Sequence, residues 1–387
     1  MTAGRTMAEL LPLSGVTVVD VTRMLPGAVL VRSLVDLGAR VVKVEDPAGG
    51  DPMRSLPPLV GGTGAGFCAF FRGVESLALD LRTEAGLTAL AKLARHADVL
   101  LESFRPGTLD RWGLPLPSLR ERCPALVTCS LSGFGPAEPW ASLPGHDLNF
   151  VAASGLLLEL RAAGVPRVQL ADVTAGHLAL SGILAALLLR ARTGRGSHVE
   201  QPLATGPLPF LTWTLADRSA GGGGVTEGLL SGRAPSYGVY ACADGREVAV
   251  GALEPKFWIE LVTALGLPEL AGDGLDTGER GEEAARRLAD AFRSRPSADW
   301  LALAADRGIP LTPVREAGEV SSDPYLRSTG ALREEAAPGG GRLTVPGPAV
   351  GGGRRELPPA PALGEGNVRI LRELGLDRAG ARRSGPA

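Results

Sequence analysis

The sequence predicts an α/β fold, in which a doubly wound, Rossmann-like parallel sheet forms a large split domain that carries a smaller α+β domain. Three observations predict it. Short β-branched runs, typical of buried parallel strands, alternate with helical stretches over residues 1–204. Alternation of this length is typical of βαβ units. After residue 204 a Gly-rich connection leads into a hairpin pattern, and the chain ends in a helix that needs a surface to dock on.

The elements of the large domain follow from this alternation. Residues 15–20 (Gly-Val-Thr-Val-Val-Asp) predict the first buried strand, and a helix is expected over residues 29–37, where Gly38 is placed to end it. Residues 40–45 predict the second strand. The same pattern predicts strands at 76–81, 98–102 and 125–130, and helices at 84–94 and 174–192.

We divide the chain into four parts. They are 1–204 (first part of the large domain), 205–233 (linker), 234–330 (small α+β domain) and 331–387 (return linker and C-terminal segment rejoining the large domain). Alternation over 236–252 around Asp244-Gly245 predicts a hairpin in the small domain. Helices are expected at 256–265, 281–294 and, at the end of the chain, 365–374; the Gly/Pro-rich residues 337–361 are predicted to be linker.

Composition excludes several classes of protein. A formal charge of −2 lacks the basic field that a nucleic-acid partner requires. The four cysteines show no CxxC pair and no metal-ligand spacing with histidine, which argues against a zinc site and a disulfide framework. The most apolar stretch, Leu178–Leu189, is shorter than a membrane span. With no leader at the N-terminus, we expect a cytoplasmic protein without a membrane partner.

Three segments carry groups suited to acid–base chemistry. His146 stands beside Asp147 after a loop of Gly and Pro; the alternative is a surface histidine beside a turn-forming aspartate. Asp172 lies between an apolar run and a strongly apolar helix, where it could also serve as the N-cap. Glu254 stands between a strand and a helix, and here too a carboxylate at a helix start is the alternative.

Taken in order, these segments resemble the family III CoA-transferase (CaiB/BaiF) and α-methylacyl-CoA racemase superfamily. Residues 13–20 and 34–45 are similar to its N-terminal strand–helix–strand. So are 97–114, with Glu-Ser-Phe-Arg-Pro-Gly, and 130–135, Ser-Leu-Ser-Gly-Phe-Gly. The likeness continues through 170–188, 235–254, 312–324 and 363–376, so it covers nearly the whole chain.

Within the superfamily two segments favour the racemase branch. Residues 145–150, Gly-His-Asp-Leu-Asn-Phe, match the motif that supplies the catalytic histidine of racemases, and 250–257 resemble the segment whose glutamate partners it. The resemblance therefore implies that His146 and Asp172 invert the α-carbon of a 2-methylacyl-CoA thioester through an enolate, with Glu254 behind the imidazole.

Two other functions stay open. Asp172 is common to both branches, and in a CoA transferase it would form an acyl anhydride. A repurposed or non-catalytic member of a biosynthetic pathway is the second alternative. It is motivated by Asp46, Val74 and Glu75, which stand where relatives tend to carry basic residues, and by Phe71, which replaces the usual polar residue.

The resemblance also implies a binding mode and partners. Arg105 and Arg111 are natural partners of nucleotide phosphates. We expect an interlocked homodimer, an acyl-CoA substrate, no metal and no cofactor beyond the CoA moiety of the substrate. The residues expected along CoA are Leu79, Asp80, Leu81, Arg82, Ser103, Phe104, Arg105, Arg111, Gly145, Asp147, Leu148, Asn149 and Phe150.

Overall fold

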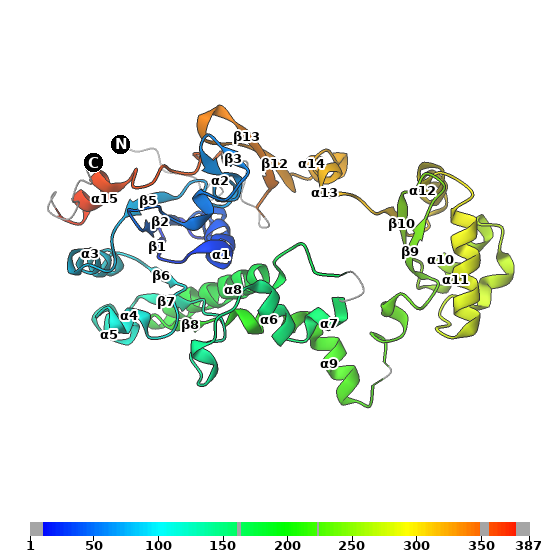
Figure 1. Ribbon diagram of the computed structural model, residues 1–387, viewed down its shortest axis with the longest axis horizontal. Coiled ribbons are helices and arrows are strands. Elements are labelled where there is room, and N and C mark those ends of the chain that lie inside the picture. Colours follow the sequence, from blue (N-terminus) through cyan, green and yellow to red (C-terminus); the bar gives the residue numbers. More distant parts are fainter. Residues whose placement is uncertain (1–10, 161–163, 223, 349–355, 377–387) are drawn as a thin grey trace. The chain divides into compact units, whose positions relative to one another are not determined.

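The computed structural model describes residues 11–160, 164–222, 224–348 and 356–376 (Figure 1). These residues form two compact units. The large unit contains the chain up to Pro209 and again from Pro324, and the small unit is Phe210–Asp323. The chain thus leaves the large unit, builds the small one and returns.

A six-stranded, all-parallel sheet is the centre of the large unit, in the order β5-β2-β1-β6-β7-β8. In chain order these strands occupy positions 3-2-1-4-5-6, the doubly wound arrangement. The predicted fold class is confirmed, and the strand order reverses between β1 and β6. The strands are β1 (Thr17–Asp20), β2 (Arg40–Glu45), β5 (Glu75–Ala78), β6 (Val99–Glu102), β7 (Val127–Ser130) and β8 (His198–Glu200).

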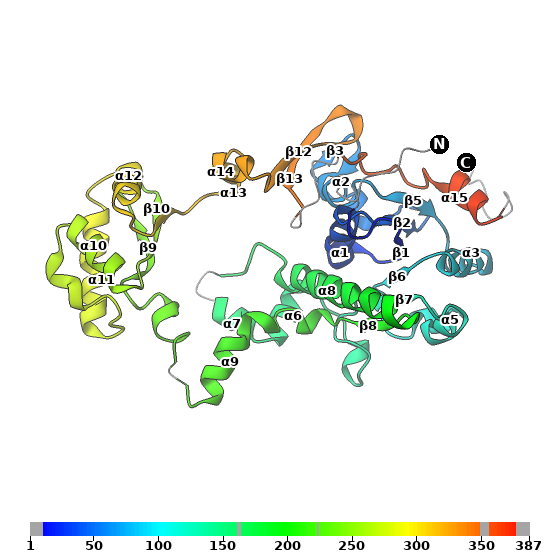
Figure 2. The ribbon, with the colours of Figure 1, turned by 180° about the vertical axis from the view of Figure 1, so that it is seen from behind.

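Helices cover both faces of this sheet because neighbouring strand residues point to opposite sides. Val18 belongs to the core beneath α1 (Met24–Asp36) and α8 (Leu170–Thr193). Val19 belongs to the other core, beneath α3 (Glu84–Arg95). Figure 2 shows α1 and α8 on one side of the sheet and α3 on the other. Continuous apolar strands buried on both faces follow from this layering.

The helix α8 is longer than predicted, with 24 residues. By length and composition alone it could cross a membrane, unlike the shorter stretch considered in the sequence, although the core helix of a globular protein passes the same test. Ala175 and Gly176 are buried, and Ala179 and Ile183 lie in the core shared with α1. The face of α8 that carries small residues therefore packs into the core on this side of the sheet.

The end of the chain returns to the sheet through α15 (Asn367–Glu373). Asn367 Oδ1 accepts the N–H of Ala78 at 2.8 Å, and Ile370 is buried in the α3-side core. The predicted linker is wrong in part: β12 (Leu332–Ala336) and β13 (Arg342–Pro346) form a hairpin there. Residues 349–355 and 377–387 of the predicted return segment lie outside the described residues.

In the small unit β9 (Tyr237–Ala241) and β10 (Glu247–Gly251) form the predicted hairpin, and Gly245 in the turn has φ +76°. β11 (Leu311–Pro313) completes the antiparallel sheet. Part of the predicted linker is helical as α9. The helices of this unit are α9 (Thr212–Ser219), α10 (Pro255–Ala264), α11 (Glu279–Phe292), α12 (Ser297–Arg307) and α13 (Ala317–Val320).

Short elements complete the large unit. They were not predicted, since none is long enough for a clear periodicity. They are β3 (Leu59–Val60), β4 (Thr63–Gly64), α2 (Ala65–Phe70), α4 (Thr108–Arg111), α5 (Leu116–Arg122), α6 (Asp147–Ala153), α7 (Leu156–Leu160) and α14 (Pro324–Ser328).

A buried ionic cluster holds the carboxyl ends of β1 and β2. The Lys43 side chain is 1% exposed, and its Nζ lies 3.1 Å from both Asp20 Oδ2 and Asp51 Oδ2. It also donates to the carbonyl of Thr22 at 3.0 Å. Burial opposes the charge of Lys43, but attraction by Asp20 and Asp51 outweighs it and raises the lysine pKa. The cluster thus holds an ammonium ion between two carboxylates.

We expect Lys43→Met to lower the free energy of unfolding by about 3–5 kcal/mol, because Asp20 and Asp51 would stay buried without a counter-ion. Urea unfolding followed by circular dichroism measures the change. Lys92→Met on α3 is the control, since Lys92 is only half-buried, and it should change stability by less than about 0.5 kcal/mol. Equal effects of the two substitutions would contradict the proposed role of the cluster.

Candidate functional site

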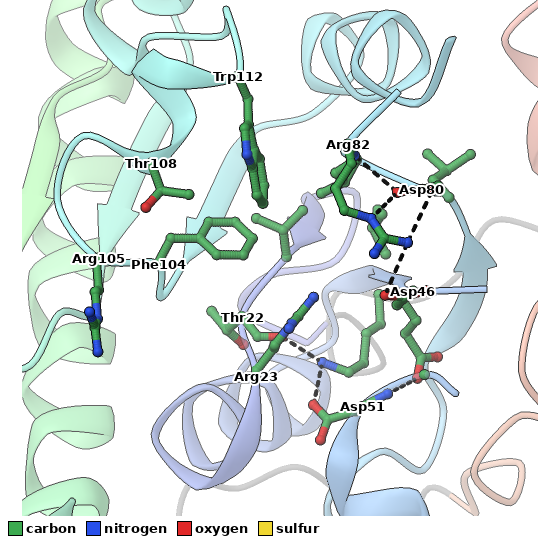
Figure 3. A pocket seen from close by; sticks show the side chains of 17 residues that line it. Thr22, Arg23, Asp46, Asp51, Asp80, Arg82, Phe104, Arg105, Thr108 and Trp112 are labelled. Carbon is green, nitrogen blue, oxygen red and sulfur yellow. Dashed lines mark hydrogen bonds and ion pairs between the residues drawn. The ribbon is translucent and has the colours of Figure 1, made fainter. Parts of the chain in front are cut away.

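A pocket of about 290 Å³ opens at the carboxyl ends of the strands where their order reverses (Figure 3). Open doubly wound sheets bind ligands at this place. The pocket takes its walls from the loops after β1, β2, β5 and β6. Its lining residues are Val21, Thr22, Arg23, Lys43, Val44, Glu45, Asp46, Gly50, Asp51, Leu79, Asp80, Leu81, Arg82, Phe104, Arg105, Thr108 and Trp112.

One wall of the pocket carries two carboxylates around one guanidinium. Arg82 Nε donates to Asp80 Oδ1 at 2.8 Å, Nη2 donates to Oδ2 at 3.1 Å, and Nη2 lies 3.8 Å from Asp46 Oδ2. The hydrogen bonds from Arg82 lower the pKa of Asp80. Because two acids surround one base, this wall, seen in Figure 3, carries a net negative charge.

The opposite rim is cationic and aromatic. Arg23 and Arg105 are exposed there, and neither forms an ion pair within the described part of the chain. Phe104 and Trp112 meet edge to face with ring centroids 5.1 Å apart. Ser103 Oγ accepts the N–H of Arg23 at 2.9 Å and so joins the loops after β1 and β6. The rim can hold an anion beside a planar apolar group.

The predicted CoA residues are only partly gathered in this pocket. Leu79, Asp80, Leu81, Arg82, Phe104 and Arg105 line it. Arg111 does not line it; its Nη2 donates to Oγ1 of Thr108, which does, at 2.9 Å. Prediction from sequence missed Arg23 and Trp112. Arg23 lies three residues after the end of the first predicted strand, so the rule that ligands bind at strand ends would have found it.

The segment Gly145–Phe150 begins helix α6 elsewhere in the large unit. The N–H of His146 donates to Asn149 Oδ1 at 3.0 Å, which fixes the first turn, and the His146 side chain is exposed. A Cβ atom on Gly145 would lie 2.7 Å from the Phe150 ring, so only glycine fits against this buried aromatic side chain. Leu148, also predicted to bind CoA, is exposed on α6.

A hydrogen bond between Asp147 and Asp172 joins the segment Gly145–Phe150 to helix α8. The N–H of Asp172 donates to Asp147 Oδ1 at 3.0 Å, which joins the first turns of α6 and α8. Asp172 occupies the third position of α8, so it is not the N-cap considered in the sequence. Burial, with repulsion by Asp147, raises the pKa of Asp172 to about 7. Asp172 can therefore both take up and release a proton near neutral pH.

Glu254 lies in the small unit, where it is exposed at the N-cap position of α10 and makes no side-chain capping hydrogen bond. Its pairing with His146 would join the two units and stays a prediction. No group of His, Cys, Asp and Glu residues within the described ranges is arranged to hold a metal ion.

We expect Asp172→Asn to stabilise the fold more at about pH 8 than at about pH 5. In the folded state the Asp172 carboxyl keeps its proton up to about pH 7, whereas in the unfolded chain it loses the proton near its ordinary pKa of 3.8. Stability therefore falls as the pH rises between these values, and an amide avoids this loss. Urea unfolding at both pH values should show a difference on the order of 1–3 kcal/mol.

Two further variants test whether Asp147 contributes to the raised pKa of Asp172. Asp147→Asn keeps an oxygen that accepts the N–H of Asp172 but removes the negative charge, so it should lower the pKa of Asp172 and weaken the pH dependence. Asp110→Asn, at an exposed carboxyl, should leave the dependence unchanged. A pH dependence of stability that is the same in Asp172→Asn as in the unsubstituted protein would refute the assignment to Asp172.

Comparison with known proteins identifies the family to which this sequence is similar. The model of CoA-transferase family III matches residues 13–367. Human alpha-methylacyl-CoA racemase is 32% identical over 327 residues, covering 83% of this chain and 82% of the racemase. Acetyl-CoA:oxalate CoA-transferase of Acetobacter aceti is 32% identical over 337 residues, covering 83% of this chain and 85% of the transferase.

A solved structure agrees with the sequence comparisons. A CAIB/BAIF family protein from Brucella suis superposes with a TM-score of 0.80 and 29% identity, covering 94% of this chain and 99% of that protein. The relatives thus include a racemase and a transferase at the same identity, and the choice between the two reactions depends on the site.

Proposed function

The chain belongs to CoA-transferase family III, and we propose that it acts as a racemase of this family, inverting the α-carbon of a 2-methylacyl-CoA thioester. The proposal rests on one observation, the Asp172 carboxyl whose pKa is raised to about 7 by burial and by Asp147. A group that exchanges a proton with a weak carbon acid works best with a pKa near the working pH. A carboxylate nucleophile has to be ionised, which this environment opposes.

In the proposed reaction Asp172 takes the α-proton, and the electron pair of the C–H bond moves into the enolate of the thioester. His146, as imidazolium, delivers a proton to the opposite face of the α-carbon. In the reverse direction the two groups exchange roles. Backbone N–H groups in the first turn of α8, other than that of Asp172, which donates to Asp147, would stabilise the enolate oxygen. In this proposal Glu254 accepts a hydrogen bond from the His146 imidazole, which fixes the tautomer of the ring and raises its basicity.

The decisive experiment is incubation with 2-methylacyl-CoA thioesters in deuterated water. We expect deuterium uptake at the α-carbon together with loss of optical activity. His146→Ala and Asp172→Asn should each lower the rate of inversion at least about 100-fold, since inversion requires both proton-transfer groups. His96→Ala is the matched control, because His96 follows α3 outside the proposed site, and it should leave the rate unchanged.

The transferase alternative makes the opposite prediction. It needs a covalent acyl adduct on Asp172, visible by intact mass, and it tolerates His146→Ala. If no 2-methylacyl-CoA thioester in a broad panel takes up deuterium and an acyl adduct forms on Asp172, the protein is a transferase and the racemase proposal is wrong. The homodimer and the cytoplasmic location stay predictions beside the proposed activity.

The pocket at the strand ends is the proposed site of the nucleotide part of the substrate. Arg23 and Arg105 would hold the diphosphate, and the Phe104–Trp112 pair would pack against the base. The wall of Asp46, Asp80 and Arg82 suits ribose hydroxyl groups. In dinucleotide-binding folds, an acidic residue after the second strand accepts a hydrogen bond from a ribose hydroxyl in the same way. A phosphate on the ribose would meet net negative charge there.

We therefore expect the protein to bind dephospho-CoA at least as tightly as CoA. Asp46→Arg should raise the ratio of CoA to dephospho-CoA affinity about tenfold, which corresponds to 1.4 kcal/mol, by reversing the charge next to Arg82. Isothermal titration calorimetry measures both constants. Asp306→Arg makes the same charge change in the small unit and should leave the ratio unchanged. A wild-type protein that strongly prefers CoA contradicts the assignment of this wall.

A further inference from the structure

A second cavity lies on the α1–α8 side of the large unit and shares no residue with the pocket at the strand ends. Its volume is about 300 Å³, within the range of small-molecule sites. Most of its surface is apolar, with contributions from α1, the end of α2, α8 and β13. The side chains that matter here are Val29, Phe70, Leu180 and Val345, with Arg32 and Arg72 as the two bases.

Arg72 is the exceptional residue of this cavity. It is 2% exposed, and its Nε and Nη1 atoms have no hydrogen-bond partner. Glu335 Oε1 lies 3.6 Å from Nη1, close enough to balance charge but beyond hydrogen-bond distance. Buried donors without acceptors are rare in folded proteins because they lose their hydration without replacement. The Arg72 guanidinium, which lines the cavity, therefore has two donors that an acceptor on a ligand could satisfy.

Arg32 presents a further donor. Its Nε and Nη2 bind the carboxylate of Asp36, while Nη1 is buried without a partner. Burial and the nearby charge of Arg72 lower the pKa of Arg32 to about 9. The two guanidinium groups thus repel each other across a mainly apolar space, and an anion between them would relieve that repulsion.

We propose that this cavity binds the carboxylate of a small aliphatic acid, with its oxygens accepting from Arg72 and Arg32 and its hydrocarbon chain against Val29, Phe70 and Leu180. Asp36 and Glu335 already offset part of the positive charge of Arg32 and Arg72, so a monoanion fits better than a phosphate. The apolar walls select a ligand with a hydrocarbon body. The inference does not depend on the reaction assigned to Asp172.

Histidine NMR provides a direct test, because the chain has four histidines and His177 lines this cavity. Hexanoate is the probe, and hexanamide is its neutral analogue. Titration with hexanoate should shift the His177 signal, identified by its loss in His177→Gln, in a saturable way, and leave the His96 and His198 signals in place. Hexanamide should bind at least about tenfold more weakly, since it lacks the charge.

Two variants separate the binding site from folding. Arg72→Met combined with Glu335→Gln removes the buried pair together, which avoids an unpaired carboxylate, and should weaken hexanoate binding at least about tenfold. Leu180→Phe fills the cavity without changing its charges and should weaken binding as well. Arg190→Met breaks an ion pair with Asp98 elsewhere in the large unit and should have no effect. Absence of a saturable His177 shift, or equal binding of hexanoate and hexanamide, overturns the proposal.

Discussion

The attraction between the Lys43 ammonium and the carboxylates of Asp20 and Asp51 is the constraint on which the large unit depends. It joins the ends of β1 and β2 to Asp51 in the segment after β2, and Lys43 and Asp51 line the pocket where the strand order reverses. Because both acids already surround Lys43, this buried charge is not available to a ligand. The anion-binding capacity of the pocket is therefore left to the exposed arginines Arg23 and Arg105, which the fold places on the rim.

The distribution of charge around this pocket follows from the fold and limits what it can bind. The loops after β1 and β6 bring cations, whereas the loops after β2 and β5 bring Asp46 and Asp80, with Arg82 held between them. A ligand with one anionic end and one hydroxyl-bearing end matches this polarity, and a ligand with phosphates at both ends does not. Glu75, another departure from the basic pattern of relatives, is explained differently. It pairs with Arg40 and Arg369 and so helps to hold α15 on the sheet.

Much of the fold could be predicted because its strands are short, β-branched and buried on both faces, which leaves a clear signal in residues such as Val41 and Val42. The hairpin β12–β13 was missed because its turn glycines resemble a linker, although Thr344 and Val345 are good strand residues. The site was harder to predict. The Asp147–Asp172 hydrogen bond joins residues 25 positions apart and depends on how α6 meets α8. The burial of Arg72 depends likewise on elements far apart in sequence, which no local pattern records.

The contact between Asp147 and Asp172 also bears on how one aspartate can serve two reactions in a single family. The geometry of α8 fixes where the Asp172 carboxyl lies, but its chemistry depends on its neighbours. A nearby negative charge, added to burial, favours the protonated form and so a role in proton exchange. A neutral or cationic neighbour in the same place would favour the ionised form, which attacks a thioester as a nucleophile. In this chain the neighbour is Asp147, so under the proposed function the residue that sets the protonation of Asp172 is a different one from the residue that exchanges the proton.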